Sequence, residues 1–308
     1  MVQALVGAWG LVAQATGASW PAETPTLPPV PSALYVVTIL GLIAIVVLAI
    51  RVRTRPGLLD LRRTPGRQGS IGPVHVAGVL FLWMAVQLLV PYFLLPVFGM
   101  TAQTATQPDN RLALLQLTVI VATASAAALL VASLAAGRIT FRLGLVRGMG
   151  LDTRHWVYDT LAAVFAFFAV MPVVLGLLEL TTAALGALHV KVQEHVVLTA
   201  LKELGPSWKA LAFVGAAVIT PPAEELFFRG LVQTMFRQYL GRSWVAIGIT
   251  SVFFAAMHME TPNAIPSLVA LAMVLGYLYE RSGRLYSPIL LHAIFNTFNM
   301  CVELAGQS

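Results

Sequence analysis

Charged side chains are scarce in this sequence. Asp, Glu, Lys and Arg make up 10% of the 308 residues, whereas 58% are hydrophobic. Ordinary soluble domains carry about 25% charged residues, so the composition excludes a typical soluble fold. Several apolar runs approach the ~20 residues that a helix needs to cross a ~30 Å hydrocarbon core. The sequence therefore predicts a polytopic membrane protein.

Cysteine is almost absent as well, because Cys301 is the single one in the chain. This excludes an internal disulfide framework and a cysteine-based metal site. The apolar runs also lack the alternation of lipid-facing and inward-facing residues that barrel strands show. We therefore expect an all-α transmembrane bundle of seven or eight spans.

The net charge of +6 does not indicate nucleic-acid binding, because the arginines lie in short loops between apolar runs and have no aromatic residues among them. They instead follow the positive-inside pattern of membrane proteins. The loops that we expect in the cytoplasm contain Arg51, Arg53, Arg55, Arg62, Arg63 and Arg67; Arg138, Arg142, Arg147 and Arg154; Arg237 and Arg242; and Arg281 and Arg284.

The chain divides into three regions by composition. Residues 1–32 combine an apolar segment, either a signal peptide or a first helix, with a Pro-rich linker. Residues 33–204 form an N-terminal transmembrane region, and an interfacial segment, 189–208, overlaps its end. Residues 205–304 form a third region. The expected spans are 33–50, 75–99, 112–136, 157–183, 209–240, 243–259, 263–281 and 287–304.

Two prolines interrupt the apolar run 209–240. Pro221 and Pro222 remove hydrogen-bond donors and clash with carbonyls one turn back, so we expect this helix to break or kink there. Within a bilayer, such an interruption is tolerated where the backbone faces protein or a wet cavity. The interruption is the first indication of a functional site.

Three charged residues follow the prolines at once. Glu225 and Arg229 are an i,i+4 pair in the favourable order, which leaves Glu224 without a local cation. Each charge costs ~2.5–3.5 kcal/mol near the centre of a membrane helix, so intramembrane charges usually serve a function. The alternative without chemistry is an ion pair that anchors the helix. Glu224 is the natural candidate for a general base.

Two further pairs carry polar side chains in apolar helices. Phe254 and His258 lie one turn apart, as do His292 and Asn296. Taken alone, each histidine could be a satisfied core residue, and Asn296 could join two helices. Together with Glu224 they could supply a base, a proton carrier and two donors for an oxyanion, which is what amide hydrolysis requires. No H-E-x-x-H zincin motif occurs.

In this order, Glu224-Glu225-x-x-x-Arg229, Phe254-x-x-x-His258 and His292-x-x-x-Asn296 resemble the motifs of the CPBP family, which comprises CAAX prenyl proteases and bacteriocin-processing Abi proteins. The resemblance covers roughly residues 205–304. It implies an intramembrane endopeptidase in which Glu224 activates water with help from His258. By the same resemblance, His292 and Asn296 form the oxyanion hole, and Glu225 and Arg229 support the site together with Phe254.

The resemblance favours a metal-free glutamate mechanism and hence no cofactor. A zinc ion remains the alternative, because Glu224, His258 and His292 are a carboxylate and two histidines. The expected partners are a membrane-associated peptide or protein substrate and the lipid bilayer, with no nucleic acid. The alternative function is a catalytically silent membrane protein, for example an immunity or scaffold factor that binds through the same cavity. We expect the bacterial cytoplasmic membrane as the location.

Overall fold

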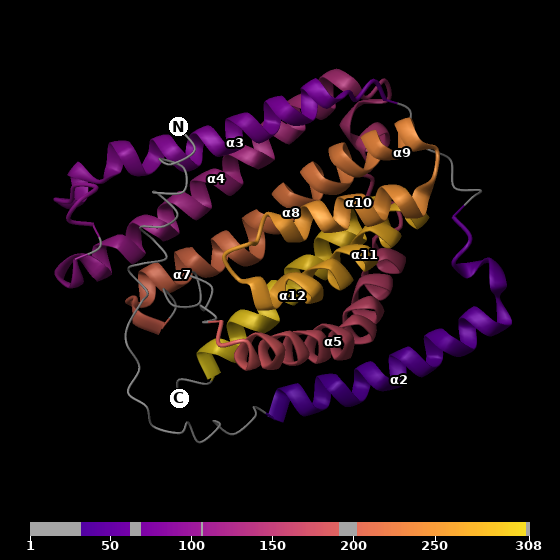
Figure 1. The fold of residues 1–308 in the computed structure, drawn as a ribbon. Helices are drawn as coiled ribbons and strands as arrows, with labels where there is room; N and C mark the ends of the chain where they lie inside the picture. Colours follow the sequence, from indigo (N-terminus) through magenta and orange to yellow (C-terminus); the bar gives the residue numbers. More distant parts are fainter. Residues whose placement is uncertain (1–31, 62–68, 106, 191–201, 306–308) are drawn as a thin grey trace.

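The computed structural model describes residues 32–61, 69–105, 107–190 and 202–305, and within these ranges the chain is helical and contains no strand (Figure 1). The expectations for residues 1–31 and most of the interfacial segment 189–208 concern residues outside those ranges. Seven of the described helical segments are long and apolar enough to span a membrane. The predicted all-α polytopic bundle is confirmed.

Four long helices precede the region with the polar motifs. They are α2 (Ser32–Thr54), α3 (Pro73–Leu94), α4 (Arg111–Thr140) and α5 (Trp156–Ala187). Helices α3 and α4 pack together on one side of the molecule, and α2 packs on α5 on the other (Figure 1). Gly41 allows the close packing of α2 on α5, because a Cβ at this position would lie 2.4 Å from the Pro172 ring.

The C-terminal helices fill the space between these two pairs. A single helical rod covers residues 206–240 and consists of α7 (Pro206–Val214), a π-helical stretch (Gly215–Ile219), α8 (Thr220–Glu225), a second π-helical stretch (Leu226–Gln233) and α9 (Thr234–Leu240). The remaining helices are α10 (Ser243–Ala256), α11 (Ile265–Ser282) and α12 (Tyr286–Ala305).

The rod 206–240 is the central helix of the bundle. Half of the residues in its most apolar 18-residue stretch are buried by protein. In the corresponding stretch of Pro73–Phe98, which contains α3, 6% are buried, so α3 is largely exposed for contact with lipid. Its side chains Phe227 and Leu231 pack with Met149 and Phe254 in the largest buried cluster. A helix surrounded by protein can carry polar groups that lipid would not tolerate.

The structure refines one prediction about helix boundaries and corrects another. The α-helical hydrogen-bond pattern of residues 206–240 is interrupted next to Pro221, as the prolines predict, but π-helical stretches on both sides of α8 keep the rod helical instead of breaking it. Helix α10 ends at Ala256 rather than residue 259, so that His258 lies in the turn that follows. The His258 imidazole itself binds the Phe254 carbonyl, at 3.0 Å, while the His258 N–H turns to Ala255.

Gly241 and Gly283 follow the ends of α9 and α11. Both glycines adopt left-handed conformations (φ 65° and 68°), which close α9 and α11 at little steric cost. The last helix begins at Tyr286, one residue before the predicted Ser287.

The arginine-rich loops lie together at one end of the bundle, as their common charge predicts. The Ser70 N–H donates to the Thr140 carbonyl at 2.9 Å, which joins the first two loops. The Leu285 N–H donates to the Gly150 carbonyl at 2.8 Å, which joins the second and the last. The Tyr277 hydroxyl donates to the Leu58 carbonyl at 2.8 Å.

Candidate active site

Glu225 is the best-connected acidic residue of the central rod. Its side chain is fully buried, and its Oε1 accepts hydrogen bonds from Arg229 Nη1 at 2.8 Å and from His292 Nδ1 at 2.9 Å. Arg229 also donates through Nη2 to the Ala272 carbonyl at 3.1 Å, and its guanidinium lies 5.0 Å from the centre of the Phe254 ring. Glu225 therefore links α8 to α12, and Arg229 links the same rod to α11.

Glu224 differs from its neighbour in being accessible. Its side chain retains 17% exposure, against 0% for Glu225 and 5% for His292. The Glu224 Oε2 lies 3.8 Å from His292 Nε2, which is too far for a direct hydrogen bond. One water molecule with hydrogen bonds of about 2.8 Å to each atom would bridge that distance. Of the two glutamates, Glu224 is the one whose side chain is partly exposed, and its Oε2, which faces His292, is buried without a hydrogen-bond partner among the described residues.

The hydrogen bonds determine the tautomer of each histidine. The Phe254 carbonyl can only accept, so His258 carries a proton on Nδ1 and presents Nε2 as the acceptor of the neutral ring. Glu225 accepts from Arg229, and the same reasoning places the His292 proton on Nδ1. Both imidazoles therefore act through Nε2, as an acceptor when neutral and as a donor when doubly protonated.

The Phe254 ring lies at the centre of these groups. Its centroid is 5.0 Å from that of His258 and 5.8 Å from that of His292, and Arg229 stacks over it. The ring is 1% exposed and also contacts Phe228 edge-on. Phe254 thus brings residues from three helical segments into one cluster and separates the ion pair from water.

Asn296 lies one turn beyond His292 on α12 and faces the first π-helical stretch. Its Nδ2 donates to the Ala216 carbonyl at 2.8 Å. One amide hydrogen is thus used within the protein, and the second remains for another acceptor. The structure therefore gathers Glu224, Glu225, Arg229, Phe254, His258 and His292 in one cluster, with Asn296 at its edge.

The sequence leaves open a zinc site formed by Glu224, His258 and His292. Among the residues that the structure describes, no group of three or more His, Cys, Asp or Glu side chains is placed to share a metal ion. Glu224 Oε2 and His292 Nε2 lie 3.8 Å apart, and the His258 Nδ1 is bound to the Phe254 carbonyl, which leaves His258 Nε2 as its free ring nitrogen. We derive no step through a metal.

The sequence reasoning missed a row of polar residues that continues from the ion pair. Gln233, buried at 1% exposure, donates to the Gly276 carbonyl at 3.1 Å, and Arg237 pairs with Glu280 at 2.9 Å. The signal was present, because residues 225, 229, 233 and 237 repeat every four positions. This row fastens the central rod to α11 along several turns.

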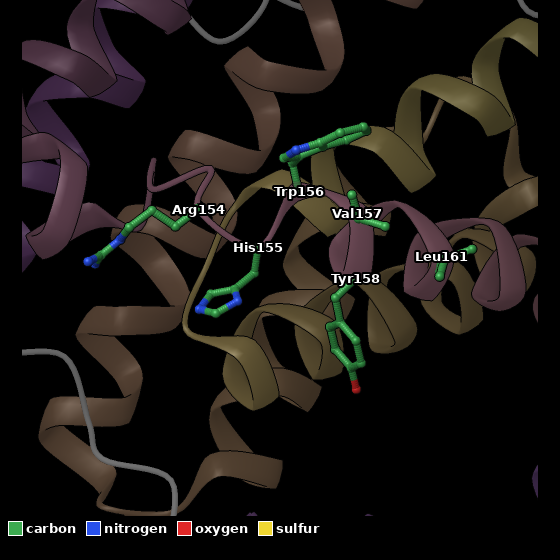
Figure 2. A pocket seen from close by; sticks show the side chains of 6 residues that line it. All are labelled: Arg154, His155, Trp156, Val157, Tyr158 and Leu161. Atoms are coloured by element: carbon green, nitrogen blue, oxygen red, sulfur yellow. The ribbon is translucent and has the colours of Figure 1, made fainter.

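A shallow hollow of about 360 Å³ lies elsewhere, at the start of α5 (Figure 2). Its exposed Trp156 and Tyr158 have the character of side chains at a membrane surface. Beside it, hydrogen bonds from Arg154 lower the pKa of the Asp152 carboxyl to about 2. The hollow is lined by Arg154, His155, Trp156, Val157, Tyr158 and Leu161, none of which is a predicted site residue.

Fold and site together define a polytopic membrane protein with a buried glutamate–histidine cluster. Residues 206–298 match the family model described as "Rce1-like: Type II CAAX prenyl endopeptidase Rce1-like". The match includes every predicted site residue and confirms the resemblance to the CPBP family, although it covers less than half of the chain. No curated protein and no solved structure matches the chain.

Proposed function

We propose that the protein is an intramembrane endopeptidase of the CAAX type in which Glu224 activates the attacking water. The similarity to type II CAAX prenyl endopeptidases supports the reaction class. The observation that carries the mechanism is the contrast between two adjacent glutamates. Glu225 is enclosed by Arg229 and His292, whereas Glu224 is partly accessible and faces His292 Nε2.

In the proposed reaction, the Glu224 carboxylate accepts a proton from water while the water oxygen attacks the scissile carbonyl carbon. The carbonyl becomes a tetrahedral oxyanion, which donors in the site stabilise. By family similarity these donors are the Nε2–H of His292, in its doubly protonated form because Nδ1–H is already donated to Glu225, and the second amide hydrogen of Asn296. The intermediate then collapses, the C–N bond breaks, and the proton held by Glu224 passes to the leaving nitrogen. The products are a carboxylic acid and an amine.

His258 assists from the turn after α10 by accepting a hydrogen bond from the attacking water through Nε2. Glu225 and Arg229 take no part in proton transfer in this scheme. Glu225 holds the His292 ring in place through Nδ1, as buried carboxylates do for histidines in many active sites. The substrate is a membrane-associated peptide or protein, and the bacterial cytoplasmic membrane is the proposed location.

Glu224→Gln tests this proposal, because glutamine keeps the shape of the side chain but cannot accept the proton. We expect cleavage of a membrane-peptide reporter to fall by about 10²–10⁴-fold, with the unfolding midpoint unchanged. Glu179→Gln, at an exposed glutamate of α5, is the matched control and should cleave normally. Purified, chelator-treated protein removes the contribution of contaminating metalloproteases.

Cleavage within a few-fold of the parent in Glu224→Gln would overturn the mechanism. If the parent cleaves nothing and its cellular phenotype survives Glu224→Gln, the silent binding or immunity function replaces the peptidase.

A further inference from the structure

The first π-helical stretch of the central rod, Gly215–Ile219, cannot extend further because of Pro221. In a π-helix each N–H donates to the carbonyl five residues back, and the Thr220 N–H does so to Gly215. The next donor in this series would be residue 221, which would bind the Ala216 carbonyl. Residue 221 is proline and has no N–H. The sequence therefore removes the backbone partner of the Ala216 carbonyl.

Asn296 supplies the missing donor. Its Nδ2 lies 2.8 Å from the Ala216 oxygen, a normal hydrogen-bond distance, although the two residues are 80 positions apart in the chain. Ala216 is partly buried, and a carbonyl without any partner would be costly there, the more so inside a bilayer. The amide of Asn296 thus completes the π-helical turn that Pro221 leaves open.

This bond also selects between two registers of the rod. In an uninterrupted α-helix the Thr220 N–H would bind the Ala216 carbonyl itself, so this carbonyl would have a backbone partner and would not need the Asn296 amide. The π-helical turn accommodates one extra residue, so every residue beyond it is rotated by about 100° relative to the α-helical path. Glu224 lies four residues beyond this turn. A return to the α-helical register would rotate Glu224 away from His292, at present 3.8 Å away.

We propose that Asn296 is a positioning residue that holds the central rod in the π-helical register and thereby aims Glu224 at His292. The proposal rests on the proposed function to the extent that Glu224, the side chain being positioned, is the general base. Asn296 and His292 lie one turn apart on α12, so one helix both sets the rotation of the rod and provides the group that Glu224 faces. The second amide hydrogen of Asn296 is not used by this role.

The register can be measured without relying on proteolysis. In a Cys301→Ser background, Glu224→Cys and His292→Cys place two thiols at positions whose native side chains nearly touch. A short bifunctional thiol reagent should bridge them. Adding Asn296→Ala should slow bridging by at least about tenfold, since bridging needs both sulfurs in the right orientation.

Asn299→Ala is the matched control, because Asn299 lies on the same helix and its amide makes no hydrogen bond to the described residues. It should leave bridging unchanged. In the protein with native Glu224 and His292, Asn296→Ala should lower kcat by on the order of 10²-fold, as expected for a displaced base. Fast bridging in Asn296→Ala together with lost cleavage would show that Asn296 acts on the substrate, and would overturn the positioning role.

A second variant keeps the test valid if Asn296→Ala destabilises the protein. Pro221→Ala provides a backbone N–H for a carbonyl that the proline leaves open. The fall in the unfolding midpoint caused by Asn296→Ala should therefore be smaller in the Pro221→Ala background than with Pro221 present. Equal falls in both backgrounds would refute the hydrogen-bond replacement.

The two proposals fail separately. If Glu224→Gln retains cleavage but bridging depends on Asn296, the glutamate mechanism fails and the positioning role stands. If Glu224→Gln is inactive and bridging ignores Asn296, the reverse holds.

Discussion

The buried pair of Glu225 and Arg229 predicts a large stability change from one substitution. Arg229→Met keeps most of the apolar bulk but leaves the Glu225 carboxylate and the Ala272 carbonyl without the guanidinium. Breaking a buried ion pair by removing one partner costs about 3–5 kcal/mol. His292 still donates to Glu225 and offsets part of the loss, so we expect about 3 kcal/mol.

The double variant Glu225→Gln/Arg229→Met distinguishes the charge effect from lost packing. It removes both charges and keeps an acceptor for His292, so it should lose only about 1–2 kcal/mol, mainly for the Ala272 carbonyl. Unfolding free energies from a denaturing-detergent titration in mixed micelles measure both variants. A single variant within 1 kcal/mol of the parent, or a double variant as unstable as the single, would refute the reasoning.

Two smaller predictions follow from other contacts. Gly276→Ala should destabilise the protein by about 1–3 kcal/mol, because the added Cβ would lie 2.8 Å from Gln233 Oε1 and 3.0 Å from Ile247 Cγ2. Gly248→Ala is the control, because a Cβ at that position meets no atom within 4 Å. The control should be neutral or slightly stabilising. The hydrogen bond from Arg111 lowers the pKa of Glu203, so this pair stabilises the fold above the ordinary glutamate pKa and ceases to do so as pH falls through the lowered value. The pair is about one-third exposed, so Glu203→Gln should cost at most about 1 kcal/mol at pH 7. This cost should decline as pH falls through the lowered pKa of Glu203, measured by unfolding along a pH series; an undiminished cost in acid would contradict this.

Much of the architecture could be predicted from the sequence because its causes are local. Apolar runs long enough to cross a bilayer indicate spans, and the positions of arginines indicate which loops lie at the same end. The pairing of Glu225 with Arg229 follows from four-residue spacing within one helix. The left-handed ends at Gly241 and Gly283 are equally local, since they depend on the absence of a side chain.

The errors arose where a hydrogen bond formed in the folded chain overrode a rule based on the local sequence. Proline rules predicted a break at Pro221, but π-helical turns and a donor from α12 keep the rod continuous. Apolar character extended a helix through His258, whereas the imidazole binds the Phe254 carbonyl and the helix ends earlier. Neither outcome is visible in the hydrophobic pattern, because each is decided by which hydrogen bonds are satisfied in the folded chain.

The sequence by itself determined that this is a helical membrane protein with a cluster of ionisable groups inside apolar helices of the last third, since the cost of placing charge in lipid acts on each residue separately. The tertiary structure alone decided that Glu225 is enclosed and Glu224 accessible, because that difference depends on His292, 67 positions away. It also decided the rotation of the rod, through one amide bound to one carbonyl left open by a proline.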